Sequence, residues 1–97
     1  MSGTRAAIRY AKAVLSLAID QKSEKTINED MKLIARTVSE NEELDLALKN
    51  AIVKQDAKKE ILNQVFKGIN PLTSKLFDVL VENNRIDAVA DVAHKYN

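Results

Sequence analysis

The fold is decided by residues 4–20, TRAAIRYAKAVLSLAID, a stretch rich in alanine and leucine that contains neither glycine nor proline. This composition predicts one helix over the whole stretch. On a helical wheel the apolar side chains cover roughly two-thirds of the circumference, whereas an ordinary surface helix shows a stripe of roughly 100°. The narrow remaining wedge holds Arg5, Arg9, Lys12, Ser16 and Asp20. Such a helix has more apolar surface than one neighbour can bury.

Two interpretations of this wide apolar arc stay open. It indicates either a central bundle helix with partners on both sides, or a helix of which one side faces a groove for another protein's helix. In the second case Tyr10, Ala13 and Leu17 face the groove. Small residues such as Ala6 and Ala13 would let a second backbone approach closely.

Composition sets the class of protein. The 97 residues are enough for one domain with one modest core, and 45% hydrophobic with 30% charged residues indicates a globular chain. The absence of cysteine excludes disulfides and thiolate metal sites. A net charge of +1 gives no general attraction to nucleic acid or anionic lipid. No apolar run approaches the roughly 20 residues of a membrane span, so we expect a soluble, intracellular protein without membrane insertion.

Three further helices are predicted before residue 68. Ser23 is a candidate N-cap for the second helix and Asn41 for the third. The second helix carries a narrow apolar stripe made of Ile27, Met31, Ile34, Ala35 and Val38. Residues 50–54 are predicted to connect to a fourth helix, with Ile52 and Val53 turned inward. The expected buried side of the fourth helix consists of Ala57, Ile61, Leu62, Val65 and Phe66.

The last two helices complete an all-α fold. Gly68 is a helix stop, and Asn70-Pro71 combines a capping residue with proline at the first helical position. The fifth helix, residues 71–83, shows a second wide apolar arc. Asn84 is expected to end it and to cap a sixth helix together with Asp87 as a capping box. Six helices with short connections predict a single-domain antiparallel six-helix bundle.

No arrangement of residues indicates catalysis, a cofactor or a metal. His94 is the only histidine, and although Asp87 and Asp91 share its flank, acidic helix surfaces commonly have this pattern. Neither Ser16 nor Ser39 has the glycine-rich elbow or the neighbouring base of a nucleophilic serine. We therefore expect no enzyme activity.

The lysines between residues 54 and 67 leave an alternative function open. Lys54, Lys58, Lys59 and Lys67 could contact RNA phosphates, which would make the chain an all-α RNA-binding bundle. The cluster lacks interleaved aromatic residues and contains acidic ones, so a solvated face and no nucleic-acid partner are favoured. A third possibility is a module that self-associates through its apolar arcs, although we expect a monomer in isolation.

Three motifs occur in order and at suitable distances: RYAKAV at residues 9–14, KKEIL at residues 58–62 and VLVENNRI at residues 79–86. Together they resemble the delta subunit family of bacterial rotary ATP synthases, which includes the mitochondrial oligomycin-sensitivity-conferring protein. Residues 9–14, RYAKAV, followed by Leu17-Ala18, are similar to the opening signature of that family. Residues 79–86, VLVENNRI, resemble its helix–turn–helix near the end of the N-terminal domain. Residues 58–62, KKEIL, are similar to its fourth helix. Asn84 departs from the glycine common at that position, but asparagine also tolerates a left-handed turn.

The resemblance implies a stator component of the ATP synthase, peripheral at the cytoplasmic face of the bacterial inner membrane. Residues 1–97 would be the N-terminal helical domain, which holds the N-terminal helix of an alpha subunit between its first and fifth helices. The C-terminal domain that meets the b subunits is expected to be absent from this chain. The family's groove falls here on Tyr10, Ala13 and Val79. Wheel geometry adds the flanking residues Ala6, Leu17, Leu76 and Asn83.

Overall fold

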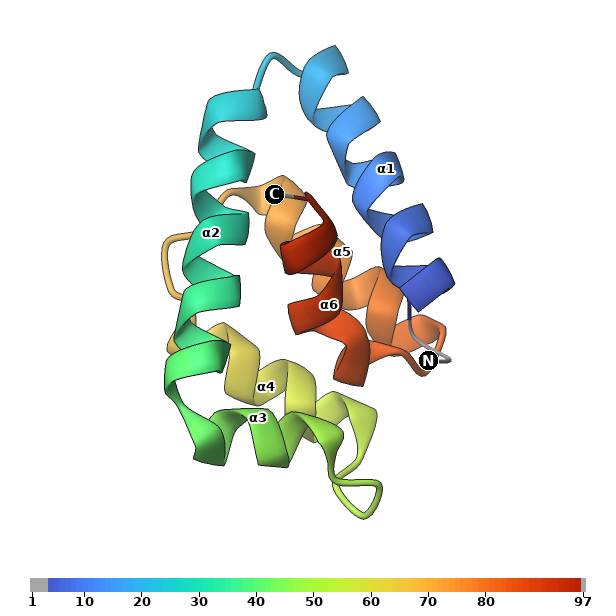
Figure 1. Ribbon diagram of the computed structural model, residues 1–97, viewed down its shortest axis with the longest axis vertical. Helices are drawn as coiled ribbons and strands as arrows, with labels where there is room; N and C mark the ends of the chain where they lie inside the picture. The colour runs from blue at the N-terminus through green and yellow to red at the C-terminus, as the bar shows by residue number, and fades with distance from the viewer. Residues whose placement is uncertain (1–3, 97) are drawn as a thin grey trace.

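The computed structural model describes residues 4–96, which form six α-helices and one 3-10 turn without any strand (Figure 1). The elements are α1 (Thr4–Asp20), α2 (Glu24–Glu40), α3 (Glu42–Lys49), α4 (Gln55–Val65), α5 (Pro71–Glu82), η1 (Ile86–Ala88) and α6 (Val89–Tyr96). The predicted all-α six-helix fold is confirmed for this part of the chain. Its first helix has the bounds that composition predicted.

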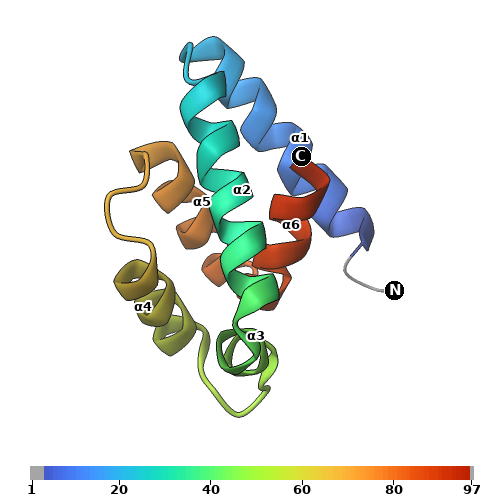
Figure 2. The ribbon, with the colours of Figure 1, turned by 60° about the vertical axis from the view of Figure 1, so that its left-hand side comes forward.

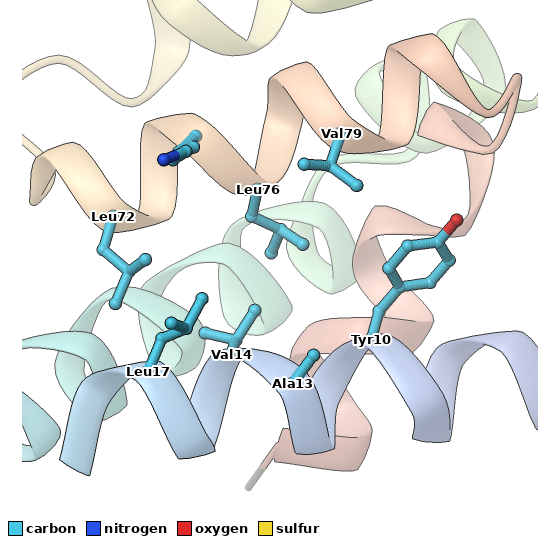
Figure 3. Close-up of a pocket in the computed structure, with 8 residues that line it drawn as sticks. Tyr10, Ala13, Val14, Leu17, Leu72, Leu76 and Val79 are labelled. Atoms are coloured by element: carbon cyan, nitrogen blue, oxygen red, sulfur yellow. The ribbon is translucent and has the colours of Figure 1, made fainter. Parts of the chain in front are cut away.

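The helices are arranged around an antiparallel pair. Helices α1 and α2 are joined at one end, and the short α6 lies between them and packs against both (Figures 1 and 2). Helix α5 runs antiparallel to α1 on another side of the molecule, so that residue 72 lies near residue 17 and residue 79 near residue 10 (Figure 3). Helix α1 packs much more extensively on α6 than on α5, which leaves part of the α1–α5 boundary open.

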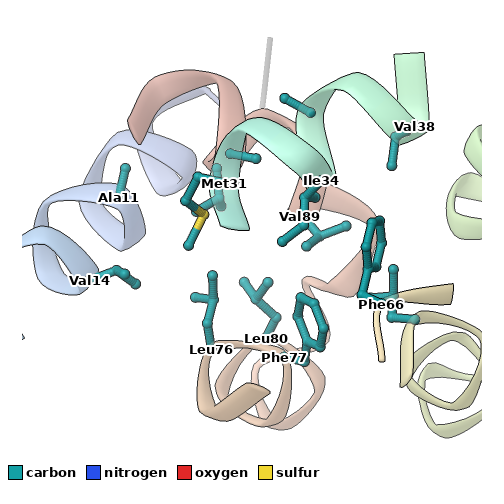
Figure 4. Close-up of a cluster of buried hydrophobic side chains, with 14 of the residues drawn as sticks. Ala11, Val14, Met31, Ile34, Val38, Phe66, Leu76, Phe77, Leu80 and Val89 are labelled. Atoms are coloured by element: carbon teal, nitrogen blue, oxygen red, sulfur yellow. The ribbon is translucent and has the colours of Figure 1, made fainter. Parts of the chain in front are cut away.

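The hydrophobic core draws buried side chains from all six helices and from η1, and Figure 4 shows the part of it where α2 faces α5. Met31 and Ile34 of α2 face Leu76, Phe77 and Leu80 of α5, and all five side chains are buried. Phe66, directly after α4, closes one side of the core. Its ring centroid is 6.5 Å from that of Phe77, in a tilted arrangement favourable for aromatic pairs.

Helix ends follow local rules that the sequence displays. Asn41 Oδ1 accepts a hydrogen bond from the backbone N–H of Leu44 at 3.1 Å, and Asn70 Oδ1 accepts one from Leu72 at 2.9 Å. The N-caps predicted at Asn41 and Asn70 are therefore confirmed, whereas Ser23 makes no side-chain capping bond to α2. Gly68 adopts φ +82°, a left-handed conformation that suits glycine, in the turn that separates α4 from α5.

Two predictions of inward-facing residues are wrong. Ile52, expected to point inward, is 90% exposed. In α4 the buried stripe is Lys58, Leu62 and the following Phe66, whereas Ala57 and Val65 are exposed. The aliphatic stem of Lys58 is apolar and extends this stripe at spacing i, i+4, i+8. A helical wheel that counts Lys58 as polar therefore places the buried face of α4 about one residue out of register.

The start of the last helix also differs from the prediction. Residues 86–88 form the 3-10 turn η1, and Arg85, in the N-cap position, makes no side-chain capping bond. The backbone N–H of Ile86 instead donates to Gln55 Oε1 of α4 at 3.1 Å. A side chain from a distant helix therefore satisfies the donor, and the capping box predicted for Asn84 and Asp87 does not form.

Candidate functional site: an apolar groove between α1 and α5

Helix α1 presents apolar side chains on three sides. Its core-facing stripe consists of Ala7, Ala11, Val14 and Ala18, all buried. The flank toward α5 carries Ala13 and Leu17, and Leu17 remains 45% exposed. The opposite flank carries Ile8, Leu15 and Ile19, which are also exposed. The wide arc predicted from sequence is thus only partly covered by the chain itself.

The flank toward α5 forms one wall of an open apolar groove with a cavity of about 110 Å³. Figure 3 shows Leu17 of α1 lying across from Leu72 of α5, and Tyr10 from Val79. Leu76 is buried and forms the floor together with Val14, while Ala13 leaves space between the larger side chains. The antiparallel course of the two helices therefore gives a groove that follows both helix axes, which suits a rod-shaped apolar ligand.

The groove brings together five of the seven residues predicted for the site. They are Tyr10, Ala13, Leu17, Leu76 and Val79. The other two, Ala6 and Asn83, lie beyond the Tyr10 end of the groove and line a neighbouring polar hollow. The structure adds Val14, Leu72 and Lys75 to the lining. Leu72 stands four residues before Leu76, so the helical period could have indicated it.

Tyr10 stands at the junction of the apolar groove and the polar hollow and lines both. Its hydroxyl oxygen accepts a hydrogen bond from Asn83 Nδ2 at 2.8 Å. This bond joins the first half of α1 to the end of α5, and it fixes the ring at one end of the groove. Asn83 is exposed and contributes a polar edge there.

The residues considered for metal binding do not assemble into a site. Asp91 and His94 line a polar hollow between α6 and α3, but Asp87 belongs to η1 and does not line that hollow. Across residues 4–96, no three histidine or acidic side chains are close enough to hold a metal ion.

The lysines considered for RNA do not form a continuous solvated face. Lys58 is only 3% exposed, so the expectation of a solvated side chain is wrong at this position. Lys59 forms an ion pair with Asp78 of α5. The hydrogen bond to Asp78 and its charge raise the pKa of the Lys59 ammonium. One of the four lysines is thus buried and another is paired with α5, which gives the RNA-binding alternative no support.

Within residues 4–96, no helix combines the length and the apolar character needed to cross a bilayer.

Comparison with known proteins places the chain in a family. Residues 6–97 match the family model described as ATP synthase delta (OSCP) subunit. The chain is 42% identical over 97 residues to the ATP synthase subunit delta of Flavobacterium psychrophilum, which covers all of this chain and 55% of that relative. It is 45% identical over 96 residues to the corresponding subunit of Christiangramia forsetii, covering 99% of this chain and 52% of the relative.

A more distant relative gives the same result. The ATP synthase subunit delta of Staphylococcus aureus is 33% identical over 89 residues, covering 91% of this chain and 50% of the relative. The chain spans about half the length of these curated relatives. The family suggested by the motifs in α1, α4 and α5 is confirmed, and the chain belongs to the ATP synthase delta (OSCP) subunit family.

Proposed function

We propose that this chain is a non-catalytic stator component of a rotary ATP synthase that holds the N-terminal helix of an alpha subunit in the groove between α1 and α5. The observation that carries the proposal is the open apolar groove, which lies between two of the helices that bear the family motifs. The lining is apolar and open along its length, as a helix-in-groove contact requires. The residues that line the groove carry two titratable groups, the Lys75 ammonium and the Tyr10 phenol. The groove is therefore suited to binding a partner rather than to catalysing a reaction.

The role would be mechanical. A stator must resist the torque of the rotor, and therefore needs a tight contact that dissociates slowly. A docked amphipathic helix that buries several hundred Å² of apolar surface gains on the order of 10 kcal/mol gross, at about 25 cal/mol per Å². Ordering of the peptide and lost freedom on association offset a substantial part of this gain. The remainder is compatible with a dissociation constant below about 1 μM.

The wider assembly forms part of the same proposal. We infer that residues 1–97 act as the domain that holds the catalytic head, while a second domain of the kind that completes the longer relatives would meet the b subunits. In that arrangement the protein would sit peripherally at the cytoplasmic face of the bacterial inner membrane. The chain by itself would be a monomer whose groove is vacant.

Titration with the N-terminal peptide of the cognate alpha subunit tests the groove directly. We expect amide chemical-shift changes to concentrate on α1 and α5, around Tyr10, Ala13 and Val79, because these residues line the proposed contact. Changes confined to α2 or α3 would overturn the proposed site.

A charge placed in the groove gives a second test. Ala13 is exposed, so Ala13→Asp should leave the fold intact while a carboxylate faces the apolar side of the peptide. We expect at least about tenfold weaker binding by calorimetry, equivalent to about 1.4 kcal/mol or more. Leu15→Asp is the matched control, because it adds the same charge to the opposite flank of α1, where Leu15 is 41% exposed. Equal loss of affinity in both variants, or unfolding of Ala13→Asp, would exclude Ala13 as a groove residue.

A second copy of this chain is the competing occupant of the groove. Sedimentation at high protein concentration separates the two cases. A monomer is expected, whereas a dimer that Ala13→Asp dissociates would assign the groove to self-association instead.

A further inference from the structure

We propose that Arg5, Arg9 and Arg85 form a carboxylate-binding subsite at the Tyr10 end of the groove, and that the docked helix places an acidic end there. This inference rests on the proposed function and deepens it. The groove would then recognise an apolar stripe along the helix and one or more Asp or Glu side chains at one end of it. These side chains would fix the direction in which the helix lies.

The subsite is the polar hollow next to the groove. Its lining consists of Arg5, Ala6, Arg9, Tyr10, Asn83 and Arg85, around a volume of about 410 Å³. Tyr10 also lines the apolar groove, so the two hollows meet at its ring. Two arginines come from the start of α1 and the third from the turn after α5. The antiparallel course of α1 and α5 therefore brings together cations that are some 80 residues apart in sequence.

Positive charge is concentrated here although the chain as a whole carries only +1. Among residues 4–96, no acidic side chain lines either the polar hollow or the apolar groove, whereas Lys75 adds a fourth cation along the groove. Residues 4–96 contain two ion pairs, Lys49–Asp45 and Lys59–Asp78, and neither of them involves the three arginines. The acids nearest to them in sequence, Asp87 in η1 and Glu82 on α5, are both exposed and lie outside the lining. These arginines are thus available to an external anion.

The dimensions and chemistry favour a helix end over a small diffusible anion. From Arg5 to Leu17, α1 advances about 18 Å at about 1.5 Å per residue, so a docked helix of about three turns would fill the apolar groove and end above the arginines. The guanidinium group matches a carboxylate with two parallel hydrogen bonds. Because all three arginines are exposed, their contribution will be screened by salt.

The experiment compares two peptides on the same protein. One is the N-terminal peptide of the cognate alpha subunit, and the other is the same peptide with every Asp and Glu replaced by Asn and Gln. By calorimetry in 50 mM NaCl we expect the amide peptide to bind about tenfold more weakly, and in 500 mM NaCl less than about threefold more weakly. The double variant Arg9→Gln with Arg85→Gln should bind both peptides with similar affinity at either salt concentration.

The matched control is Lys12→Gln with Lys95→Gln. These lysines line a hollow on the opposite flank of α1, so the variant loses the same charge without altering the proposed subsite. It should retain the full difference between the peptides, because only the local arginines matter. If it loses the difference as well, the effect is one of net charge and the subsite is refuted.

Other outcomes separate this inference from the proposed function. Equal affinity of both peptides for the wild-type protein, with shifts still on α1 and α5, would overturn the subsite and leave the groove standing. A cognate alpha N-terminal segment without any Asp or Glu near one end of its apolar stripe would have the same consequence. No binding of either peptide would overturn the proposed function.

Discussion

Asp30 of α2 connects that helix to the start of α5. Its Oδ2 accepts a hydrogen bond from the backbone N–H of Asn70 at 2.9 Å and one from Thr73 Oγ1 at 2.7 Å. Thr73 is fully buried, so this carboxylate satisfies a polar group inside the protein. It also lies at the positive end of α5, where a negative charge is favourable. Asp30 therefore positions the start of the helix that forms one wall of the groove.

Removal of this carboxylate should lower stability measurably. We expect Asp30→Ala to reduce the free energy of unfolding by about 2 kcal/mol, because hydrogen bonds to a charged group are lost and a buried hydroxyl loses its partner. Urea unfolding followed by circular dichroism provides the measurement. Asp45→Ala is the control, since the exposed pair of Asp45 with Lys49 within α3 is worth at most about 0.5 kcal/mol. Similar losses in the two variants would contradict the linking role of Asp30.

Tyr96 gives a prediction at alkaline pH. Its hydroxyl is buried without a hydrogen-bond partner among residues 4–96. Burial, followed by the charge of Glu24, raises the pKa of the Tyr96 phenol in the folded state. A raised pKa means that its contribution to stability is complete below the unfolded value of about 10 and is lost as the pH rises through the folded value.

The variant Tyr96→Phe isolates that contribution. At pH 7 we expect the variant to be at least as stable as the wild type, because it loses an unpaired buried hydroxyl. Above about pH 10 the wild type should lose stability relative to the variant. Parallel pH profiles of the two proteins in chemical unfolding would show that Tyr96 is solvated in solution.

At the scale of elements, rules that involve only neighbouring residues were sufficient for most helix ends but not for all. Asn41 and Asn70 cap as predicted, because their partners lie two or three residues away. Ser23 precedes α2 as expected, yet its hydroxyl donates to the Gln21 carbonyl at 3.2 Å and caps nothing. The tight turn after α1 determines the backbone conformation of Ser23. The local sequence pattern does not predict that turn. The bond from Ile86 to Gln55 spans 31 residues and could not be predicted locally.

Two helices end in the same left-handed turn. After α1, Lys22 has φ 55° and the N–H of Ser23 donates to the Ala18 carbonyl at 2.8 Å. After α5, Asn84 has φ 56° and the N–H of Arg85 donates to the Leu80 carbonyl at 2.7 Å. Both are Schellman motifs, in which glycine is the residue best suited to the left-handed position.

Glycine at these positions should therefore stabilise the protein. We expect Lys22→Gly to raise the free energy of unfolding by up to about 1 kcal/mol, since a lysine side chain is strained in this conformation. Asn84→Gly should gain less, because asparagine tolerates the conformation better. Thermal or urea unfolding would measure both effects. Asn50→Gly is the control: Asn50 has φ −72°, so glycine brings no relief there and should be destabilising. A loss of stability in Lys22→Gly would mean that the turn opens in solution.

At the scale of the whole molecule, the groove depends on the relative placement of helices. The wheel of α1 correctly indicated more apolar surface than the chain covers, because its arc extends to both sides of the core stripe. The equally wide arc of α5 is mostly covered, with Leu72, Leu76, Phe77 and Leu80 all buried. Periodicity gives the width of an apolar face but not the position of its neighbours. For the same reason the wheel placed Ala6 and Asn83 in the groove, although they lie past its end, and excluded Lys75, which lines it.

This arrangement predicts that an occupant of the groove stabilises the entire fold. A helix in the groove would contact both α1 and α5, which contact each other only sparingly. A ligand that binds only the folded state at 100 times its dissociation constant adds about 2.7 kcal/mol to the free energy of unfolding. For a domain of this size that corresponds to an increase in Tm of about 10–20 °C. The measurement is calorimetric melting with increasing concentrations of the alpha N-terminal peptide. Leu15→Asp should show the full increase, whereas Ala13→Asp at the same peptide concentration should show a clearly smaller one. A peptide that binds without raising Tm would have comparable affinity for the unfolded chain, which is incompatible with docking in a groove that only the folded protein possesses.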